Sequence, residues 1–316
     1  MDGDPFGTPP EARGEIQFSA GGFTPRAFPN KTLPGAAWRL LTYFAIFFVL
    51  WSVSLFILGQ LLRPVRGVFS PSYELYGELV GFLAAFFSAW IMAHLEERSL
   101  GAYGLPVRGA FGKLFTQGCL LGLCQLSALV GVIAVFGGYS FGGLVEHGAA
   151  MAKWALYWSI FFVVVGLFEE FFFRGYTLYT LAEGIGFWPA AVLLSLAFGA
   201  FHIRNSGEGW AGIASVVFIG IFWSFTLKRT GSLWLALGMH AAFDFGETFL
   251  FSVPDSGIIF PGHLSSATLQ GPQWLTGGSA GPEASLFDFV IVVILFFIVH
   301  LLYPAKQTQQ SGAATS

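Results

Sequence analysis

The sequence predicts an all-α, polytopic membrane protein with about eight transmembrane helices. Of its 316 residues, 55% are hydrophobic and only 10% are charged, and the mean hydropathy is +0.68. A soluble domain carries about 25% charged residues, because its surface must be solvated. The hydrophobic residues also gather in separate runs of the length that a bilayer-spanning helix needs, about 20 residues.

Eight such runs follow one another, and we interpret residues 37–303 as one transmembrane domain. A cleaved signal peptide is not expected, because the first run starts late and is too long. The runs are Ala37–Leu62, Tyr73–Leu95, Leu114–Phe136, Trp154–Leu181, Phe187–Ile203, Trp210–Leu227, Leu233–Phe251 and Leu286–Tyr303.

The segments outside these runs differ from them in composition. Residues 1–34 are rich in proline, glycine and small polar residues, which predicts a disordered tail. Residues 304–316 form a C-terminal tail. The segment 252–285 is rich in Gly, Ser and Pro and has no Lys or Arg. We interpret it as an extracytoplasmic loop, because it is too polar to cross a bilayer.

The distribution of basic residues predicts the orientation of the chain. Cytoplasmic loops of membrane proteins carry an excess of Lys and Arg. With eight spans and a cytoplasmic N-terminus, ten of the 15 Lys and Arg lie inside, four lie outside, and Arg174 lies within a span. Both termini are therefore predicted to be cytoplasmic, in an integral protein of a bacterial inner membrane. The bilayer is one expected partner, and the net charge of −3 argues against nucleic acid as another.

The fourth run contains three ionisable residues within six positions, Glu169, Glu170 and Arg174. An ionisable side chain inside a membrane span costs about 2.5–3.5 kcal/mol on insertion scales, and it indicates function by default. Glu170 and Arg174 are four residues apart, so they share one helix face and are expected to form an ion pair. Glu169 points about 100° away from that face. A purely structural ion-pair cluster is the alternative explanation.

Two later runs contain a histidine among small residues. The fifth ends in Phe198-Gly-Ala-Phe-His202, and the seventh contains His240-Ala-Ala-Phe-Asp244. The neighbouring glycines and alanines allow helix backbones to approach closely. We therefore expect Glu169, His202, His240 and Asp244 to converge from three helices.

This set of side chains suits the activation of a water molecule. A carboxylate in a setting of low polarity is a competent general base, and an imidazole can stabilise an oxyanion. Two histidines and a carboxylate also form a catalytic zinc pattern, so Zn²⁺ on Glu169, His202, His240 and Asp244 is a second possibility. Neither chemistry is favoured by the residues alone.

The ordered motifs resemble those of the CPBP family (CAAX protease, Abi and bacteriocin-processing proteins), which consists of intramembrane proteases. The motifs are Glu169-Glu170-x-x-x-Arg174, Phe198-x-x-x-His202 and His240-x-x-x-Asp244. The resemblance covers about residues 154–251 and implies a conical or bundle-like catalytic core there. It implies an intramembrane endopeptidase that acts on a membrane-associated protein or peptide and needs no cofactor.

The resemblance also implies a role for each residue. Glu169 would activate water, His202 would hold that water, and His240 with Asp244 would stabilise the oxyanion. Glu170 and Arg174 would support them.

One position departs from the prenyl endopeptidase branch of the family, which has Asn where this chain has Asp244. Aspartate at this position is common in the prokaryotic branch, so the substrate need not be prenylated. An ionised aspartate would repel an oxyanion. We therefore expect Asp244 to be protonated, to act through His240, or to bind a metal.

Two other functions are compatible with the sequence. A non-catalytic immunity or binding protein of the Abi type would keep its activity when Glu169 is replaced by Gln. A proton-coupled transporter would use buried Glu and His as a relay. The chain lacks the paired broken helices that such transporters show in both halves.

Overall fold

The computed structural model describes residues 32–65, 67–205, 207 and 209–304. Most of the predicted tail 1–34 and nearly all of the tail 304–316 lie outside these residues. The elements are α1 Leu33–Leu62, α2 Pro71–Leu95, η1 Leu100–Tyr103, α3 Lys113–Val135, β1 Tyr139–Ser140, α4 Gly148–Arg174, α5 Tyr176–Ile185, α6 Phe187–His202, α7 Trp210–Thr230, α8 Trp234–Phe245, the π-helix η2 Gly246–Leu250, β2 Thr268–Leu269, α9 Gln273–Thr276, η3 Pro282–Ala284 and α10 Leu286–Leu302.

The all-α, polytopic prediction is confirmed. Every predicted hydrophobic run is helical. Within the described residues, five helical segments are long and apolar enough to cross a membrane, namely α1, α2, α3, the α4–α5 segment and α7. The helices α6 and α10 are apolar but shorter, and α8 continues into the π-helix η2.

The fourth run differs from the prediction in one respect. It forms two helices, α4 and α5, rather than one, and α4 begins at Gly148, before the predicted start. The chain changes direction at Gly175, where a Cβ atom would lie 2.3 Å from the carbonyl oxygen of Phe171. Only glycine fits this close backbone contact, and the break follows directly after Arg174.

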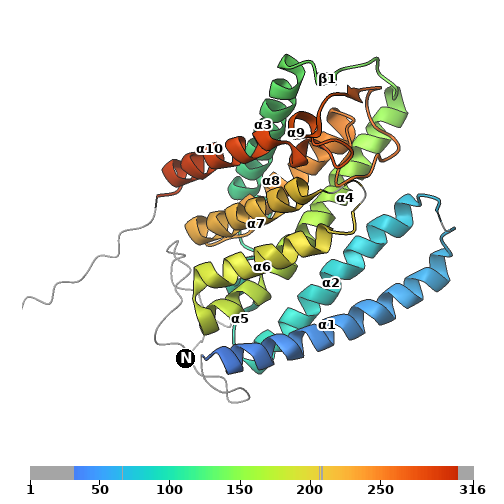
Figure 1. Ribbon diagram of the computed structural model, residues 1–316. Coiled ribbons are helices and arrows are strands. Elements are labelled where there is room, and N and C mark those ends of the chain that lie inside the picture. Colours follow the sequence, from blue (N-terminus) through green and yellow to red (C-terminus); the bar gives the residue numbers. More distant parts are fainter. Residues whose placement is uncertain (1–31, 66, 206, 208, 305–316) are drawn as a thin grey trace, which may run out of the picture.

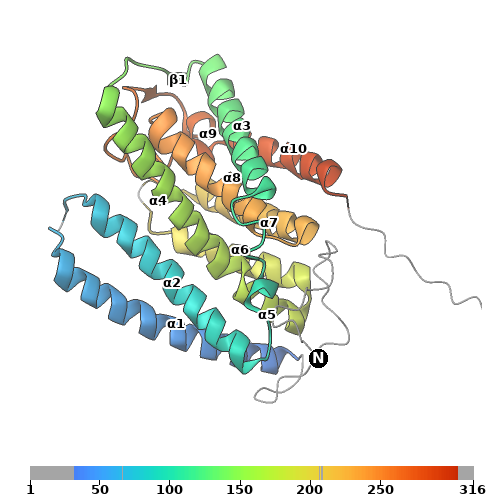
Figure 2. The same ribbon diagram turned by 180° about the vertical axis from the view of Figure 1, so that it is seen from behind.

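Helix α4 runs through the middle of the molecule and organises the other helices around it. It packs against α2 on one side and α8 on the other, and α1 lies outside α2 (Figures 1 and 2). Beyond α8 lies α3, and the helices α6 and α7 pack against each other. The acids of α4 therefore face helices from both later motifs.

Helices α3 and α8 approach so closely that their backbones touch. A Cβ atom at Gly122 would lie 2.3 Å from Met239 O, and one at Gly238 would lie 2.2 Å from Phe115 O. Gly118 makes a similar contact with Leu235 O at 2.3 Å. Glycine at such positions lets membrane helices associate by backbone packing. This contact fixes α8, in which His240 directly follows the contacting residues and Asp244 lies one turn further on.

A buried charged cluster joins α1 to the end of α2 and to α5. Arg39 Nη2 lies 2.6 Å from Glu96 Oε2, and its Nη1 lies 2.5 Å from Glu183 Oε2. Arg98 Nη1 contacts the second oxygen of Glu183 at 2.7 Å. Tyr176 OH donates to Glu96 Oε1 at 2.5 Å. These contacts hold α1 onto the rest of the molecule.

The segment 252–285 folds back over the ends of α4 and α8 and contains no helix of spanning length. Its strand β2 pairs antiparallel with β1, so that Tyr139 faces Leu269. Trp158 Nε1 of α4 donates to the carbonyl oxygen of Pro261 at 3.2 Å. Leu264 N donates to the carbonyl oxygen of Phe249 at 3.1 Å. The loop is thus a folded cover over one end of the bundle.

Candidate active site

The two adjacent acids of α4 lie in different surroundings. The side chain of Glu170 is 0% exposed and its Oε1 lies 3.2 Å from Arg174 Nη1, so the predicted i, i+4 ion pair is present. The side chain of Glu169 is 25% exposed and faces a cavity. The helical rotation between consecutive residues separates them, as the sequence predicts.

His240 is the centre of the polar cluster. Its Nδ1 lies 3.1 Å from Glu170 Oε1, and its Nε2 lies 3.3 Å from Asp244 Oδ2 and 3.7 Å from Glu169 Oε2. The ring stacks on Trp223, with 4.4 Å between ring centroids. Both ring nitrogens face carboxylate oxygens, an arrangement that favours a doubly protonated imidazole. The sequence predicts the pairing of Glu170 with Arg174 but not this contact of Glu170 with His240.

His202 reaches the same cavity from the end of α6. Its Nδ1 lies 2.9 Å from the carbonyl oxygen of Phe198. A carbonyl oxygen only accepts, so Nδ1 carries a hydrogen, and in the neutral imidazole this leaves Nε2 as an acceptor. His202 lines the cavity together with Glu169, His240 and Asp244. The structure thus gathers all four predicted residues, three by direct contact and His202 across the cavity.

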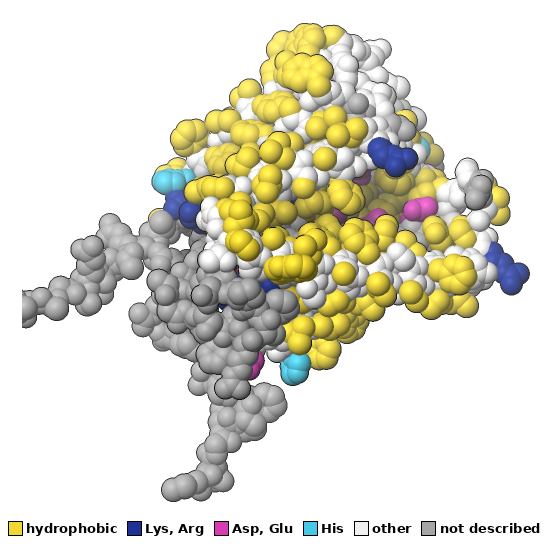
Figure 3. Space-filling model, turned by 60° about the horizontal axis from the view of Figure 1, so that its bottom comes forward, with side chains coloured by type: hydrophobic (Ala, Val, Ile, Leu, Met, Phe, Trp, Pro, Cys, Tyr) yellow, Lys and Arg dark blue, Asp and Glu magenta, His cyan; other side chains and the backbone are white. Residues whose placement is uncertain are grey.

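The cavity has a volume of about 340 Å³ and combines acidic with aromatic side chains. Figure 3 shows acidic side chains inside a hollow that hydrophobic side chains surround. Phe161, Phe162, Phe173, Phe198 and Phe201 are among the lining residues, so the carboxyl groups lie in largely apolar surroundings.

The lining also includes acids that the sequence analysis did not select. They are Glu78 from α2, Asp288 from α10, and Asp255 and Glu283 from the segment 252–285. Glu78 and Asp288 lie in predicted spans, so the rule that an intramembrane acid indicates function could have found them. The two loop acids have no such signal in the sequence.

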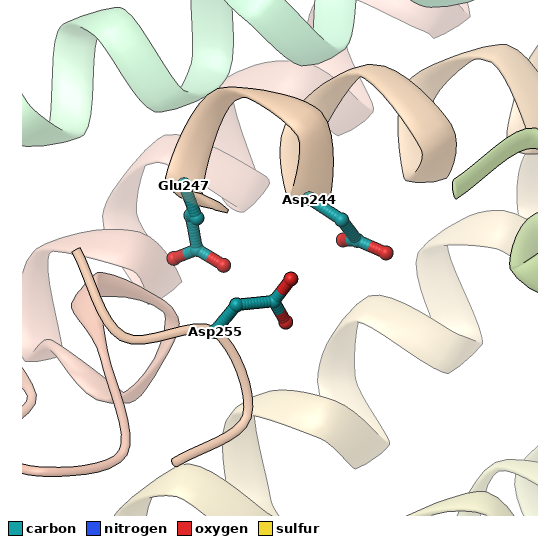
Figure 4. A group of neighbouring side chains, drawn as sticks. All are labelled: Asp244, Glu247 and Asp255. Atoms are coloured by element: carbon teal, nitrogen blue, oxygen red, sulfur yellow. The ribbon is translucent and has the colours of Figure 1, made fainter. Parts of the chain in front are cut away.

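A second acidic group adjoins the first. Oxygens of Asp244, Glu247 and Asp255 lie within 4.8 Å of one another, and the three side chains are neighbours (Figure 4). Thr248 Oγ1 donates to Asp255 Oδ2 at 3.0 Å. Burial, together with the nearby carboxyl groups of Asp244 and Glu283, raises the pKa of Asp255 well above its ordinary value.

These three acids differ from the set predicted for zinc. Among the described residues, they are the group of at least three His, Cys, Asp or Glu side chains that is close enough to share a metal ion. Only Asp244 belongs to both sets. Zinc on Glu169, His202, His240 and Asp244 therefore stays a prediction.

The chain is similar to known proteins over its central part. Residues 151–246 match the family model of the type II CAAX prenyl endopeptidase Rce1-like proteins. Over 179 residues the chain is 30% identical to YyaK of Bacillus subtilis (strain 168), a protein described as uncharacterized. This similarity covers 53% of the chain and 55% of YyaK, so the chain spans about half the length of that relative.

The matched segment contains α4 to α8 almost completely, and with them Glu169, His202, His240 and Asp244. It agrees with the region in which the motifs resemble the CPBP family. Over residues 151–246, this integral membrane protein is therefore similar to the Rce1-like family.

Proposed function

We propose that the chain is an intramembrane endopeptidase, which hydrolyses a peptide bond of a membrane-associated protein or peptide with a water activated by Glu169. The observation that carries this proposal is the position of Glu169. Its partly exposed carboxyl group faces a cavity with many aromatic lining residues, 3.7 Å from His240 Nε2, and His202 lines the same cavity. A general base needs this combination of access to water and low polarity.

The first step is the attack of water on the peptide carbonyl. The Glu169 carboxylate takes a proton from the water, and Nε2 of His202 accepts a hydrogen bond that orients it. The water oxygen bonds to the carbonyl carbon, and the carbonyl oxygen becomes an oxyanion. In protonated His240 the single hydrogen on Nε2, which also faces Asp244 Oδ2, is shared with the oxyanion and stabilises its charge, because a donor aimed at a developing oxyanion lowers the barrier.

The second step breaks the carbon–nitrogen bond. Glu169 returns the proton to the leaving amine, which regenerates its carboxylate. Asp244 and Glu170 hold the His240 ring between them, at 3.3 Å and 3.1 Å, and favour its protonated form. Arg174 in turn fixes Glu170. Asp244 thus acts through His240 in this scheme. A zinc ion on Glu169, His202, His240 and Asp244 would supply an activated water by Lewis-acid chemistry instead.

The distribution of basic residues supports an orientation in which both termini lie on the cytoplasmic side of a bacterial inner membrane. The cavity then lies near the extracytoplasmic side, because Asp255, Ser256, Ile258 and Phe260 of the folded cover line it. Substrates would accordingly be cleaved in the outer half of the bilayer or at its surface.

The proposal is tested by sequencing new protein termini in membranes from cells with the wild-type protein, Glu169→Gln or Glu74→Gln. Glu74 is an exposed acid on α2 that does not line the cavity, so it is a matched control. Cleavage products that appear with the wild type and Glu74→Gln but not with Glu169→Gln support the mechanism. Undiminished cleavage by Glu169→Gln contradicts it. A chelator that stops the wild-type enzyme would favour the zinc route.

A further inference from the structure

Asp244 also belongs to a second group of acids, whose other members, Glu247 and Asp255, have no role in the proposed hydrolysis. Asp244 lies at the end of α8, Glu247 follows three residues later in the π-helix η2, and Asp255 reaches them from the cover. A π-helical turn is often found at functional sites. Figure 4 shows Asp244 and Glu247 extending from one helical segment toward the side on which Asp255 lies.

Glu247 is the member of this group whose burial and missing hydrogen bonds indicate a bound ligand. Its side chain is 0% exposed, and neither of its carboxyl oxygens receives a hydrogen bond from the described residues. The neighbouring Glu283 is another acid, and a hydrogen bond between the two carboxyl groups requires that one of them carries a proton and donates it. Buried carboxyl oxygens are normally hydrogen-bonded or bound to a cation.

The surrounding charges do not neutralise the group. Among the described residues, six acids line the cavity (Glu78, Glu169, Asp244, Asp255, Glu283 and Asp288), and no Lys or Arg of this part of the chain does. His240 contacts Asp244 through the single atom Oδ2. Because several carboxyl groups in one site cannot all be ionised without compensation, either protons or a cation must balance them.

The spacing and the number of the carboxyl groups suit a single Ca²⁺ ion. The three oxygens lie within 4.8 Å of one another, so one ion can contact all of them at the Ca²⁺–oxygen distance of about 2.3–2.6 Å. Mg²⁺ dehydrates reluctantly and is usually held by only one or two carboxylates, so a set of three favours Ca²⁺. An all-carboxylate set also favours a hard cation over zinc, which prefers nitrogen and sulfur ligands.

We propose that Asp244, Glu247 and Asp255 bind one Ca²⁺ ion, with Glu283 close by, and that this ion ties the cover to the end of α8. The site stands independently of the proposed peptidase activity, because it is defined by ligand geometry and is tested by binding. If both hold, Ca²⁺ also neutralises Asp244, the residue whose charge would otherwise oppose an oxyanion.

The test is isothermal titration of the purified, detergent-solubilised, metal-free protein with CaCl₂, MgCl₂ and ZnCl₂. We expect one Ca²⁺ per chain, with a dissociation constant of about 10⁻³ M or lower, the range of extracellular calcium modules. Mg²⁺ and Zn²⁺ should bind at least about tenfold more weakly. Ca²⁺ should also raise the melting temperature.

The variants locate the site. Glu247→Gln and Asp255→Asn should each weaken Ca²⁺ binding by about tenfold or more, because each removes one charged ligand. The matched controls Glu74→Gln and Asp288→Asn should bind like the wild type, since Glu74 is exposed and Asp288 accepts from Gln125 and Ser215. If Glu247→Gln does not fold, Asp255→Asn alone decides the location.

Three results would overturn the proposal. The first is a wild-type protein that binds no Ca²⁺ at concentrations up to about 10 mM, well above the range of such sites. The second is unchanged binding by both ligand variants. The third is a preference for Zn²⁺ over Ca²⁺. If the wild type binds no Ca²⁺ and Glu247→Gln is more stable than the wild type, protons rather than a cation balance the acids.

Discussion

Replacing Glu170 by Gln should destabilise the protein far more than the same change at Glu169. Glu170 is fully buried and contacts both Arg174 and His240. The Arg174 side chain is 1% exposed, and its Nε and Nη2 atoms have no hydrogen-bond acceptor among the described residues. Removing one partner of such a buried pair costs about 3–5 kcal/mol, because an uncompensated charge stays behind.

The aromatic rings around Arg174 do not offset this loss. Its guanidinium lies 4.4 Å from the ring centroid of Phe198 and 5.4 Å from that of Trp223. Cation–π contacts contribute about 0.5–2 kcal/mol each, but they are present in both the wild type and the variant. Glu169 is partly exposed, so Glu169→Gln should cost about 1 kcal/mol or less.

The free energies of unfolding can be measured by denaturant titration in mixed micelles. The double variant Glu170→Gln/Arg174→Met should recover much of the loss, since replacing a buried ion pair by apolar groups is often neutral. Recovery should be incomplete, because His240 still lacks its partner. Equal stabilities of Glu170→Gln and Glu169→Gln would refute the assignment of Glu170 as the structural acid.

Two further predictions concern the packing around the site. Gly122→Val should prevent the close approach of α3 to α8, because its Cβ would lie 2.3 Å from Met239 O. We expect a loss of at least about 3 kcal/mol in unfolding free energy, measured by the same titration. A loss below about 1 kcal/mol would contradict the backbone contact. Arg39→Met should leave Glu96 and Glu183 with one cation fewer and loosen α1. Faster limited proteolysis between α1 and α2 would show this, and unchanged digestion would speak against the role of the cluster.

The helices could be predicted because bilayer crossing imposes a length and an apolar composition on each segment. The break at Gly175 could not, since glycine is common inside transmembrane helices and only the contact with Phe171 O makes it necessary here. The Gly118-x-x-x-Gly122 spacing is a visible signal for the contact of α3 with a partner helix. The sequence does not say that the partner is α8.

The candidate site shows the same division between local and tertiary information. Spacing of four residues predicts the pairing of Glu170 with Arg174 and of His240 with Asp244, because helix geometry alone decides it. The contact of Glu170 with His240 depends on how α4 packs against α8. Asp255 lies in a segment without periodicity, and only the folding of the cover brings it to Glu247.

The most direct test of the central claim uses the purified protein in liposomes with a substrate identified from the new protein termini. We predict that Glu169→Gln lowers kcat/KM by about 10²–10⁴-fold, the usual contribution of a general base. The melting temperature of Glu169→Gln should be close to those of the wild type and of Glu74→Gln. Cleavage by Glu169→Gln at the rate of Glu74→Gln would contradict the account, because another group would then activate the water.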